Sequence, residues 1–371
     1  MKFSVISNDL QKALSKVISV VPSKSTLPIL ENILFELSGN SLRLTATDLE
    51  MYLTVEIAVG GQKDGRLAIP AKRLNETVRA LPNMDLEITA EHATNKVTIK
   101  TEQGEYRMAG ETAENFPVEV KVKGQASMEL DASTLKGMVS KTLFAVSGDE
   151  LRPAMMGVLF QWKESYLSSV STDGHRLVRV ILSDVAVAKT EREVIIPAKA
   201  LNVLTKSLDT GTVTVTLGES NVLFEVGDFQ LISRIIDERY PNYESVIPID
   251  NDKRMIVNRQ GLLSAVRRCA LYSNSITNQV RLFLADGELR VSAEDMDFGG
   301  EAKEVVACQY KNEAMEIGFN AKYLEEALTH LDSEDAEFEF SSPTRAGILR
   351  PTQPPANQNI LLLVMPVRLN A

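Results

Sequence analysis

One short pattern occurs three times in this chain, at a spacing close to the size of a domain. An apolar run that ends in Pro or Asn is followed by Ala-Lys-x-Leu, with its lysine at Lys72, Lys199 and Lys322. These lysines are 127 and 123 residues apart. Solenoid units usually repeat every 20 to 50 residues or so, whereas a domain usually has about 100 to 150. The spacing therefore predicts one domain that is used three times.

Other landmarks recur at nearly the same offset. Each repeat opens with an apolar strand and a helical pattern, which covers residues 9–19, 133–145 and 260–271. A hairpin follows and ends in an acidic turn, at Asp48, Asp173 and Asp295. The Ala-Lys-x-Leu pattern then begins a second helix, in the windows 71–81, 198–208 and 321–331. Alternating strands complete each repeat.

The fold class that follows is α+β, with two helices packed on antiparallel sheets in each of three repeated domains. We expect the domains to cover residues 1–124, 125–250 and 251–371. With 371 residues, of which 44% are hydrophobic, the chain can form three cores of ordinary domain size. Gly60-Gly61 lies in a polar loop and is interpreted as a hairpin tip.

The sequence also predicts where the protein resides. It opens directly on a strand pattern with no basic-then-apolar leader, and no apolar run approaches the 18 or so residues that span a bilayer. Two cysteines, Cys269 and Cys308, occupy positions that do not correspond in the repeats and give no disulfide framework. We expect a soluble protein of the cytoplasm.

Charge is divided unevenly between helices and strands. The chain has a net charge of −10, but the six helix windows together carry +9, which leaves −19 for everything else. One explanation is that Lys and Arg are good helix formers. The other is that the helices of all repeats share a surface that faces a polyanion. Composition alone leaves both open.

A search for catalytic or metal-binding motifs finds little. The three histidines form no HExxH motif or Cys/His cluster, and no Walker or dinucleotide-binding glycine loop is present. The turn around Asp173 and His175 combines a carboxylate and an imidazole, but neighbours in a tight turn rarely point at a common atom. An enzyme that uses these two residues is a remote alternative. We expect no catalytic residue, no metal and no cofactor.

Several motifs resemble the bacterial sliding clamp family, the β subunits of DNA polymerase III, in the same order and register. They are Thr26-Leu27-Pro28-Ile29-Leu30, Thr47-Asp48-Leu49-Glu50, Thr172-Asp173-Gly174-His175-Arg176-Leu177, Tyr240-Pro241-Asn242-Tyr243 and Val364-Met365-Pro366-Val367-Arg368-Leu369. In that family three similar domains form an arc, and two arcs close a ring around duplex DNA. Helices line the hole and sheets form the outside. The resemblance implies a non-catalytic processivity factor that tethers polymerases to DNA.

The resemblance further implies an apolar cleft for client peptides between the second and third domains. The matching residues are Arg152, Met155, Thr172, Gly174, His175, Arg176, Leu177, Pro241, Val246, Asn320, Tyr323, Leu363, Met365, Pro366 and Val367. An ordinary buried strand is an equal alternative for residues 360–369. Ser245 stands where the family often has Arg, which puts one polar contact in doubt.

Basic residues of the helices and of one loop are expected to face DNA. They are Lys24, Lys72, Arg73, Arg79, Lys136, Lys141, Lys199, Lys206, Arg267 and Arg268. A solvated loop lysine is the alternative for Lys24. Asp149 occupies a position that is often uncharged in relatives, and an acid there should weaken a phosphate contact.

The family's subunit contact matches Tyr106, Leu271 and Tyr272, although Leu271 and Tyr272 could equally belong to a core. The implied partners are double-stranded DNA held without sequence specificity, a second copy of the chain, the DNA polymerase III alpha subunit, the clamp loader, and other DNA polymerases and repair proteins with short clamp-binding peptides. No membrane is implied. The alternative function is a three-repeat scaffold that binds only proteins and does not encircle DNA.

Overall fold

The computed structural model describes residues 1–124, 126–185 and 191–369. The chain divides into two compact units, which are described separately. The first unit holds residues 1–136 and 199–235, and the second holds residues 137–198 and 236–371. The central repeat is thus shared between the units, so the three predicted domain borders stay a prediction.

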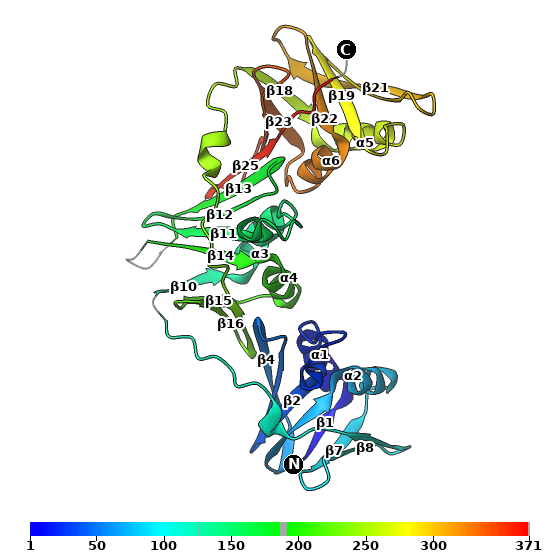
Figure 1. Cartoon of the computed structure of the whole chain (residues 1–371), viewed down its shortest axis with the longest axis vertical. Coiled ribbons are helices and arrows are strands. Elements are labelled where there is room, and N and C mark those ends of the chain that lie inside the picture. The colour runs from blue at the N-terminus through cyan, green and yellow to red at the C-terminus, as the bar shows by residue number, and fades with distance from the viewer. Residues whose placement is uncertain (125, 186–190, 370–371) are drawn as a thin grey trace. The chain divides into compact units, whose positions relative to one another are not determined.

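The first unit contains a five-stranded and an eight-stranded sheet, both antiparallel at every pair (Figure 1). The smaller sheet has the order β5-β1-β7-β8-β9, with β1 at Lys2–Ile6, β5 at Gly60–Lys63, β7 at Asp85–Glu91, β8 at Lys96–Lys100 and β9 at Glu105–Ala109. The larger has the order β10-β15-β16-β17-β4-β3-β2-β6. Its strands are β2 (Asn32–Ser38), β3 (Ser41–Thr47), β4 (Met51–Ala58), β6 (Gly65–Pro70), β10 (Ala126–Asp131), β15 (Thr212–Leu217), β16 (Asn221–Val226) and β17 (Phe229–Arg234).

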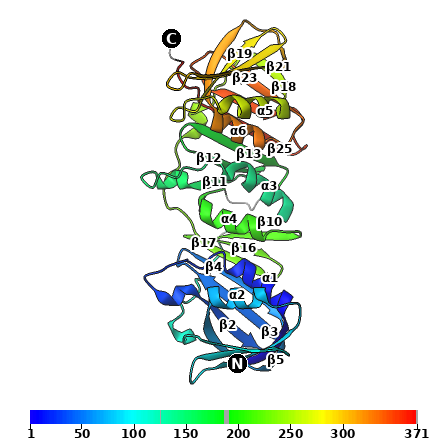
Figure 2. The ribbon, with the colours of Figure 1, turned by 90° about the vertical axis from the view of Figure 1, so that its right-hand side faces the viewer.

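Helices cover one face of this larger sheet. Figure 2 shows α1 (Ser7–Val17) and α2 (Ala71–Ala80) side by side in front of β2 and β3. In α1 the side chains of Leu10, Leu14 and Val17 are fully buried, whereas Lys12 is exposed. Their spacing of three and four residues forms the apolar stripe that fixes the helix on the sheet.

The second unit is built on one twelve-stranded sheet of order β14-β11-β12-β13-β25-β24-β23-β18-β21-β20-β19-β22. Its strands are β11 (Gly157–Trp162), β12 (Tyr166–Thr172), β13 (Arg176–Ser183), β14 (Arg192–Pro197), β18 (Lys253–Asn258), β19 (Gln279–Ala285), β20 (Glu288–Asp295), β21 (Gly300–Tyr310), β22 (Met315–Asn320), β23 (Asp335–Phe340), β24 (Gly347–Pro351) and β25 (Gln358–Val364). Helices α5 (Arg259–Ala270) and α6 (Ala321–Thr329) pack on each other, and α5 also packs on β21.

The remaining helices cross the division between the units. They are α3 (Ala132–Leu143) and α4 (Ala198–Ser207). Short 3-10 turns cover Pro28–Glu31, Ala113–Asn115, Pro153–Met156 and Tyr243–Val246. Among the described residues, no helix combines the length and apolarity needed to cross a bilayer.

The α+β class and the helix positions predicted from the sequence are confirmed. All six α-helices of the described residues begin and end within two residues of the predicted windows. At the third Ala-Lys-x-Leu, Asn320 caps α6 because its Oδ1 accepts the Lys322 backbone N–H at 3.0 Å. This explains Asn at the position where the first two repeats have Pro.

The interpretation of Gly60-Gly61 as a hairpin tip is wrong. Both residues belong to β5, where Gly61 pairs with Phe3 and Gly60 with Ser4. A Cβ on Gly61 would lie 1.8 Å from the Gly39 carbonyl oxygen, and one on Gly60 would lie 2.4 Å from Ser4 Oγ. These glycines permit close backbone approach inside a sheet and do not form a turn.

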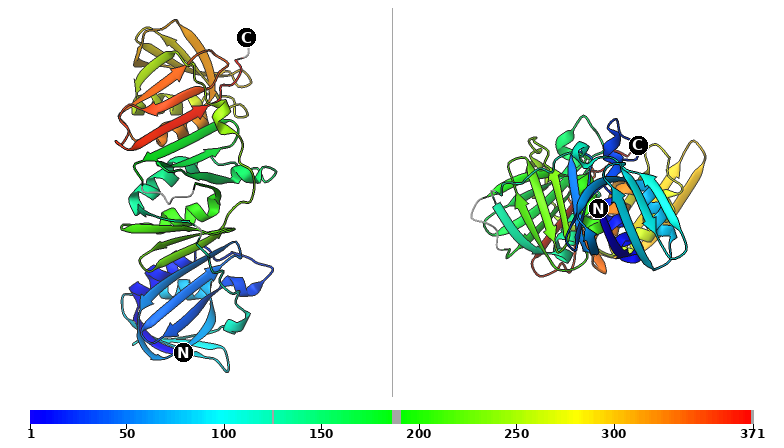
Figure 3. Two further views of the ribbon diagram at one scale, coloured as in Figure 1. Left: turned by 90° about the vertical axis from the view of Figure 1, so that its left-hand side faces the viewer. Right: turned by 90° about the horizontal axis from the view of Figure 1, so that it is seen from below.

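Each unit contains the same kind of junction between repeats, which we call a joint. In the first unit β4 pairs with β17, and in the second unit β13 pairs with β25, which Figure 3 shows as green beside red. β4 and β13 each follow an acidic turn, at Asp48 and Asp173. β17 and β25 are each the third strand after the Ala-Lys-x-Leu helix of the next repeat. A joint therefore always connects the same two positions of the repeat.

Candidate functional site

A cleft of about 530 Å³ opens on the surface of the second unit. Its wall is mainly apolar, and ten of the fifteen residues predicted for a client cleft line it. These are Arg152, Met155, Thr172, Gly174, Arg176, Leu177, Pro241, Val246, Leu363 and Met365. The structure thus brings together residues from the acidic turn, the segment after β17 and the C-terminal strand.

The acidic turn between β12 and β13 forms one side of the cleft. Gly174 has a φ of +92°, a conformation that L side chains rarely adopt. The Asp173 carboxylate accepts the backbone N–H groups of His175 and Arg176, at 2.9 and 3.0 Å. The Thr172 hydroxyl accepts the Gly174 N–H at 3.0 Å and donates to the Arg176 carbonyl oxygen at 2.6 Å. The hydroxyl and carboxylate therefore stabilise the turn itself.

The floor of the cleft is part of a buried apolar cluster. Leu177 of β13 and Leu363 of β25 are 1% and 2% exposed, and Tyr243 packs against the same cluster. The Tyr243 hydroxyl donates to Gln161 Oε1 at 2.7 Å, and burial raises the pKa of Tyr243 to about 12. Burial also raises the pKa of Tyr240. This side of the cleft is closely packed and uncharged.

The C-terminal segment is partly buried strand and partly cleft wall. In β25 residues 360–364 are buried, whereas Met365 directly after it is 41% exposed and lines the cleft. The buried-strand alternative is correct for most of this strand. Its end adds an accessible thioether, which adapts to different apolar partners.

Arg152 lines the cleft next to the acidic turn. Its Nε donates to Asp149 Oδ2 at 2.8 Å, and its Nη1 donates to the Asp173 carbonyl oxygen at 3.1 Å. The Leu151 backbone N–H and the Arg152 side chain lower the pKa of Asp149, so this carboxylate is ionised at neutral pH. Ser245 is exposed, donates to the Asn242 carbonyl oxygen at 2.8 Å and lies outside the cleft.

The other five predicted cleft residues do not line this cleft. His175 stacks on Tyr323 with ring centroids 6.0 Å apart, and Asn320 caps α6. Val367, which follows Pro366, forms a backbone bridge to Gly318. The rings of His175 and Tyr323 lie at the acidic turn, and the Tyr323 ring contacts the cleft residue Arg176.

Six lining residues were missing from the sequence prediction. They are Asn242, Tyr243, Pro248, Thr344, Arg345 and Ala346. Asn242 and Tyr243 belong to the Tyr-Pro-Asn-Tyr motif and could have been included. The last three come from the turn between β23 and β24, about 100 residues away in sequence from the motif. No local pattern marks that turn as a binding surface.

The ten cations predicted to face DNA differ in their local partners. Four form ion pairs: Lys199 with Asp48, Lys141 with Asp332 at 2.7 Å, Arg267 with Glu325 at 2.8 Å and Arg268 with Glu304 at 2.6 Å. Lys136 Nζ donates to the Leu208 carbonyl oxygen at 2.8 Å. The other five are exposed and form no ion pair within the described ranges, namely Lys24, Lys72, Arg73, Arg79 and Lys206.

The residues predicted at a subunit contact are on the surface. The exposed fractions are 39% for Tyr106, 82% for Leu271 and 49% for Tyr272, so the core alternative for Leu271 and Tyr272 is wrong. Met296 and Phe298, in the turn after β20, are 87% and 88% exposed. Exposed apolar side chains that lie together often mark a protein contact.

No group of three or more His, Cys, Asp or Glu residues in residues 1–124, 126–185 and 191–369 could hold a metal ion. Both cysteines are free thiols, and burial raises the pKa of each.

Known proteins resemble the whole chain. Family models of the DNA polymerase III beta subunit match in order: the N-terminal domain at residues 1–120, the central domain at 129–242 and the C-terminal domain at 244–368. The beta sliding clamps of Pseudomonas putida and Synechococcus elongatus are 31% and 33% identical, and each alignment covers 100% of both chains.

Solved structures agree with these matches. The DNA polymerase sliding clamp from Pseudomonas aeruginosa is 30% identical with a TM-score of 0.92, and the sliding clamp from Bartonella birtlesii bound to griselimycin is 31% identical with a TM-score of 0.94. Both alignments cover 100% of each chain. The chain therefore belongs to the DNA polymerase III beta subunit family, the DNA sliding clamps, which are non-catalytic processivity factors of DNA replication.

Proposed function

We propose that two copies of this chain close into a ring around duplex DNA and that the cleft holds short peptides of the proteins that the ring tethers. The observation that carries the ring is a joint that the chain leaves incomplete. Two joints are present, β4 with β17 and β13 with β25. The corresponding strands of the third joint are β9, at the end of the first repeat, and β21, after the third acidic turn.

Both strands have a side that is free of backbone partners within the described chain. β9 is the terminal strand of its sheet. β21 pairs with β20 along residues 300–307, while its other side pairs with β18 only at residues 308–310. Free strand edges with exposed side chains such as Tyr106 and Val305 invite pairing with another chain. A second copy supplies the missing partner for each edge.

The neighbouring side chains support the same joint. At the joint of the first unit Lys199 of α4 pairs with Asp48. The corresponding lysine and aspartate of the open joint are Lys72 and Asp295. A Cβ on Gly300 would lie 3.6 Å from the Tyr272 ring, so this exposed ring lies beside the start of β21. Two joints formed by two copies close the assembly and give β9 and β21 of each copy a partner strand.

Sedimentation tests the closure. At micromolar concentration the protein should have about twice the 40.9 kDa mass of the chain. Replacing Leu271 and Tyr272 together with Ala removes exposed apolar surface from the joint and should shift the mass toward one chain. A wild-type monomer or trimer would contradict the two-copy ring.

Duplex DNA would pass through the ring along the helices, with weak contacts from the unpaired cations. A ring that holds DNA by topology needs no tight phosphate contact, and tight contacts would hinder sliding. Asp149 is already paired with Arg152, so it reduces the positive charge available near that loop. We propose Lys24, Arg73, Arg79 and Lys206 as the principal cations near DNA, with a minor role for the paired cations and for Lys72, which corresponds to the paired Lys199 at the open joint.

The cleft supplies the tether. Its apolar floor and polar rim suit a short peptide with Leu or Phe anchors. We propose that all fifteen predicted residues contribute to this site, ten by lining the cleft and five by supporting the lining residues. The proposed clients are the DNA polymerase III alpha subunit, the clamp loader, and other DNA polymerases and repair proteins. We further propose a cytoplasmic location and domains at residues 1–124, 125–250 and 251–371.

A further inference from the structure

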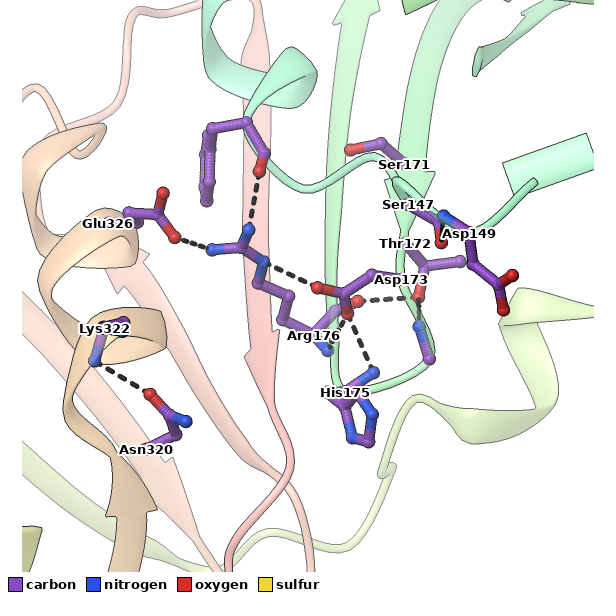
Figure 4. A network of polar contacts seen from close by, with 12 residues as sticks. Ser147, Asp149, Ser171, Thr172, Asp173, His175, Arg176, Asn320, Lys322 and Glu326 are labelled. Atoms are coloured by element: carbon purple, nitrogen blue, oxygen red, sulfur yellow. Dashed lines mark hydrogen bonds and ion pairs between the residues drawn. The ribbon is translucent and has the colours of Figure 1, made fainter. Parts of the chain in front are cut away.

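Arg176 reaches from the cleft wall into a cluster of charged and aromatic groups (Figure 4). Its side chain is only 10% exposed. Nε donates to Asp173 Oδ2 at 3.1 Å, and Nη2 donates to the Phe144 carbonyl oxygen at 2.7 Å. Every polar edge of the guanidinium therefore has a partner outside the cleft, because Nη1 is bonded to Glu326.

On one side of Arg176, its partners are two residues of α6. Glu326 forms the ion pair with Nη1, and the guanidinium lies 4.8 Å from the Tyr323 ring centroid. On the side of the segment after α3, the guanidinium lies 5.2 Å from the centroid of the Phe144 ring. This ring stacks on His330, with the two ring centroids 4.1 Å apart. Arg176 thus connects the segment after α3 to α6, across the joint formed by β13 and β25.

Glu326 supplies the carboxylate of the third repeat to this cluster. It also explains an anomaly of charge, since the α6 window is the only helix window with a negative sum, −1. The two glutamates of α6 have separate partners: Glu325 pairs with Arg267 of α5, and Glu326 pairs with Arg176.

We propose that Glu326 is a positioning residue for peptide binding: it holds Arg176 in the cleft wall and thereby couples the peptide affinity of the cleft to the α6 side of the joint. This inference rests on the proposed client function. When Arg176 is already held in one position, peptide binding does not have to order its side chain, and the entropy cost of binding is smaller. Without this carboxylate the mostly buried guanidinium keeps its ion pair with Asp173 but loses the one at Nη1, so that edge must find another partner and the side chain is held less firmly in the wall.

The substitution Glu326→Gln keeps the size of the side chain and removes its charge. With a labelled decapeptide that carries adjacent Leu and Phe anchors, the dissociation constant should rise about fivefold, a typical size for coupling between neighbouring sites. Glu326→Asp, which restores the carboxylate, should recover part of the affinity. Equal dissociation constants for wild type and Glu326→Gln would overturn the proposal.

Glu325→Gln is the matched control. It makes the same chemical change one residue earlier in α6 and breaks the pair with Arg267, which does not line the cleft. Its dissociation constant should equal that of wild type. A similar loss in both variants would show a general effect of α6 charge and would overturn the specific role of Glu326.

Thermal unfolding separates positioning from simple loss of stability. Because coupling is reciprocal, saturating peptide should raise the Tm of wild type and Glu325→Gln more than the Tm of Glu326→Gln. A lower Tm for Glu326→Gln with an unchanged dissociation constant would reduce Glu326 to a structural role. Wild-type protein that failed to bind the peptide would instead overturn the client cleft itself.

Discussion

Single residues in the acidic turn show how a set of groups that resembles a catalytic site can serve structure. Asp173 is engaged by two backbone N–H groups and by Arg176, and Gly174 supplies the positive φ that the turn requires. A Cβ on Gly174 would also lie 3.1 Å from Arg152 Nη1. The turn therefore places two arginines at the cleft, which is a binding role and not a chemical one.

Met365 gives the most direct residue-level test of the cleft. Met365→Ala removes part of an accessible apolar wall and should weaken binding of a Leu/Phe peptide by about 1 to 2 kcal/mol, as measured by titration. Ile249→Ala is a suitable control because Ile249 is 99% exposed and does not line the cleft. An unchanged affinity for Met365→Ala would place the peptide elsewhere.

Tyr243 predicts a pH dependence of stability. Its ordinary pKa is about 10, and burial raises it to about 12 in the folded protein. Between these values the unfolded chain releases a proton that the folded chain keeps, so stability is intact below pH 10 and falls as the pH rises.

The expected loss from this residue is about 1 kcal/mol at pH 11. Denaturant unfolding of wild type and Tyr243→Phe between pH 9 and 11 measures it, because Phe has no proton to release. The wild type should lose more stability over this range than the variant. Identical slopes would show that Tyr243 ionises equally in both states.

At the scale of elements, periodicity and a repeated helix opening predicted the positions of the helices. The helices were found because their apolar residues follow a period near 3.6 and begin at a repeated opening, as in Leu10, Leu14 and Val17 of α1. Strand β5 was missed because Gly60 and Gly61 have no side chains to alternate, and its pairing with β1 is set by distant backbone. Sequence patterns report local preference, whereas such pairing depends on the assembled sheet.

The same limit applies to the site. The lining residues of the acidic turn and Pro241 of Tyr-Pro-Asn-Tyr were predicted, because motifs are local, although Asn242 and Tyr243 of the second motif were missed. Thr344, Arg345 and Ala346 were not, because only the pairing of β23, β24 and β25 brings their turn to the cleft. Ion pairs between distant residues, such as Lys141 with Asp332, could not be predicted either. The sequence analysis therefore could not separate paired from unpaired basic residues of the helices.

Helix charges can be tested by comparing paired and unpaired arginines. Replacing Arg73 and Arg79 of α2 with Gln removes two unpaired cations and should weaken binding to a short linear duplex. The slope of log K against log salt should also become shallower, by about 0.9 for each phosphate that the variant no longer neutralises. Fluorescence anisotropy over a range of salt concentrations measures both effects.

The control removes a complete ion pair. Arg267→Gln with Glu325→Gln leaves the net charge unchanged and deletes a pair whose distance is 2.8 Å. It should leave DNA binding nearly as in wild type. If this double variant lost as much affinity as the Arg73 and Arg79 variant, the local ion pairs would not determine which cations contact DNA.

At the scale of the whole molecule, the chain repeats one kind of domain three times and contains two joints, and we propose that a second copy completes the third. The strands of the third joint, β9 and β21, keep free edges and carry exposed side chains at Tyr106 and Val305. The net charge of −10 and the local pairing of several helix cations argue against tight electrostatic binding of DNA. The proposed encirclement would let such a protein remain on DNA without tight contacts.

Retention on circular DNA distinguishes a topological hold from an electrostatic one. The protein is loaded on a nicked circle by the clamp loader, moderate salt is applied, and the bound fraction is measured by gel filtration before and after a restriction enzyme cuts the circle once. A ring should stay on the intact circle in salt that abolishes binding to short linear duplex, and it should leave when the circle is cut. Equal loss from intact and cut circles would contradict encirclement and favour the scaffold alternative.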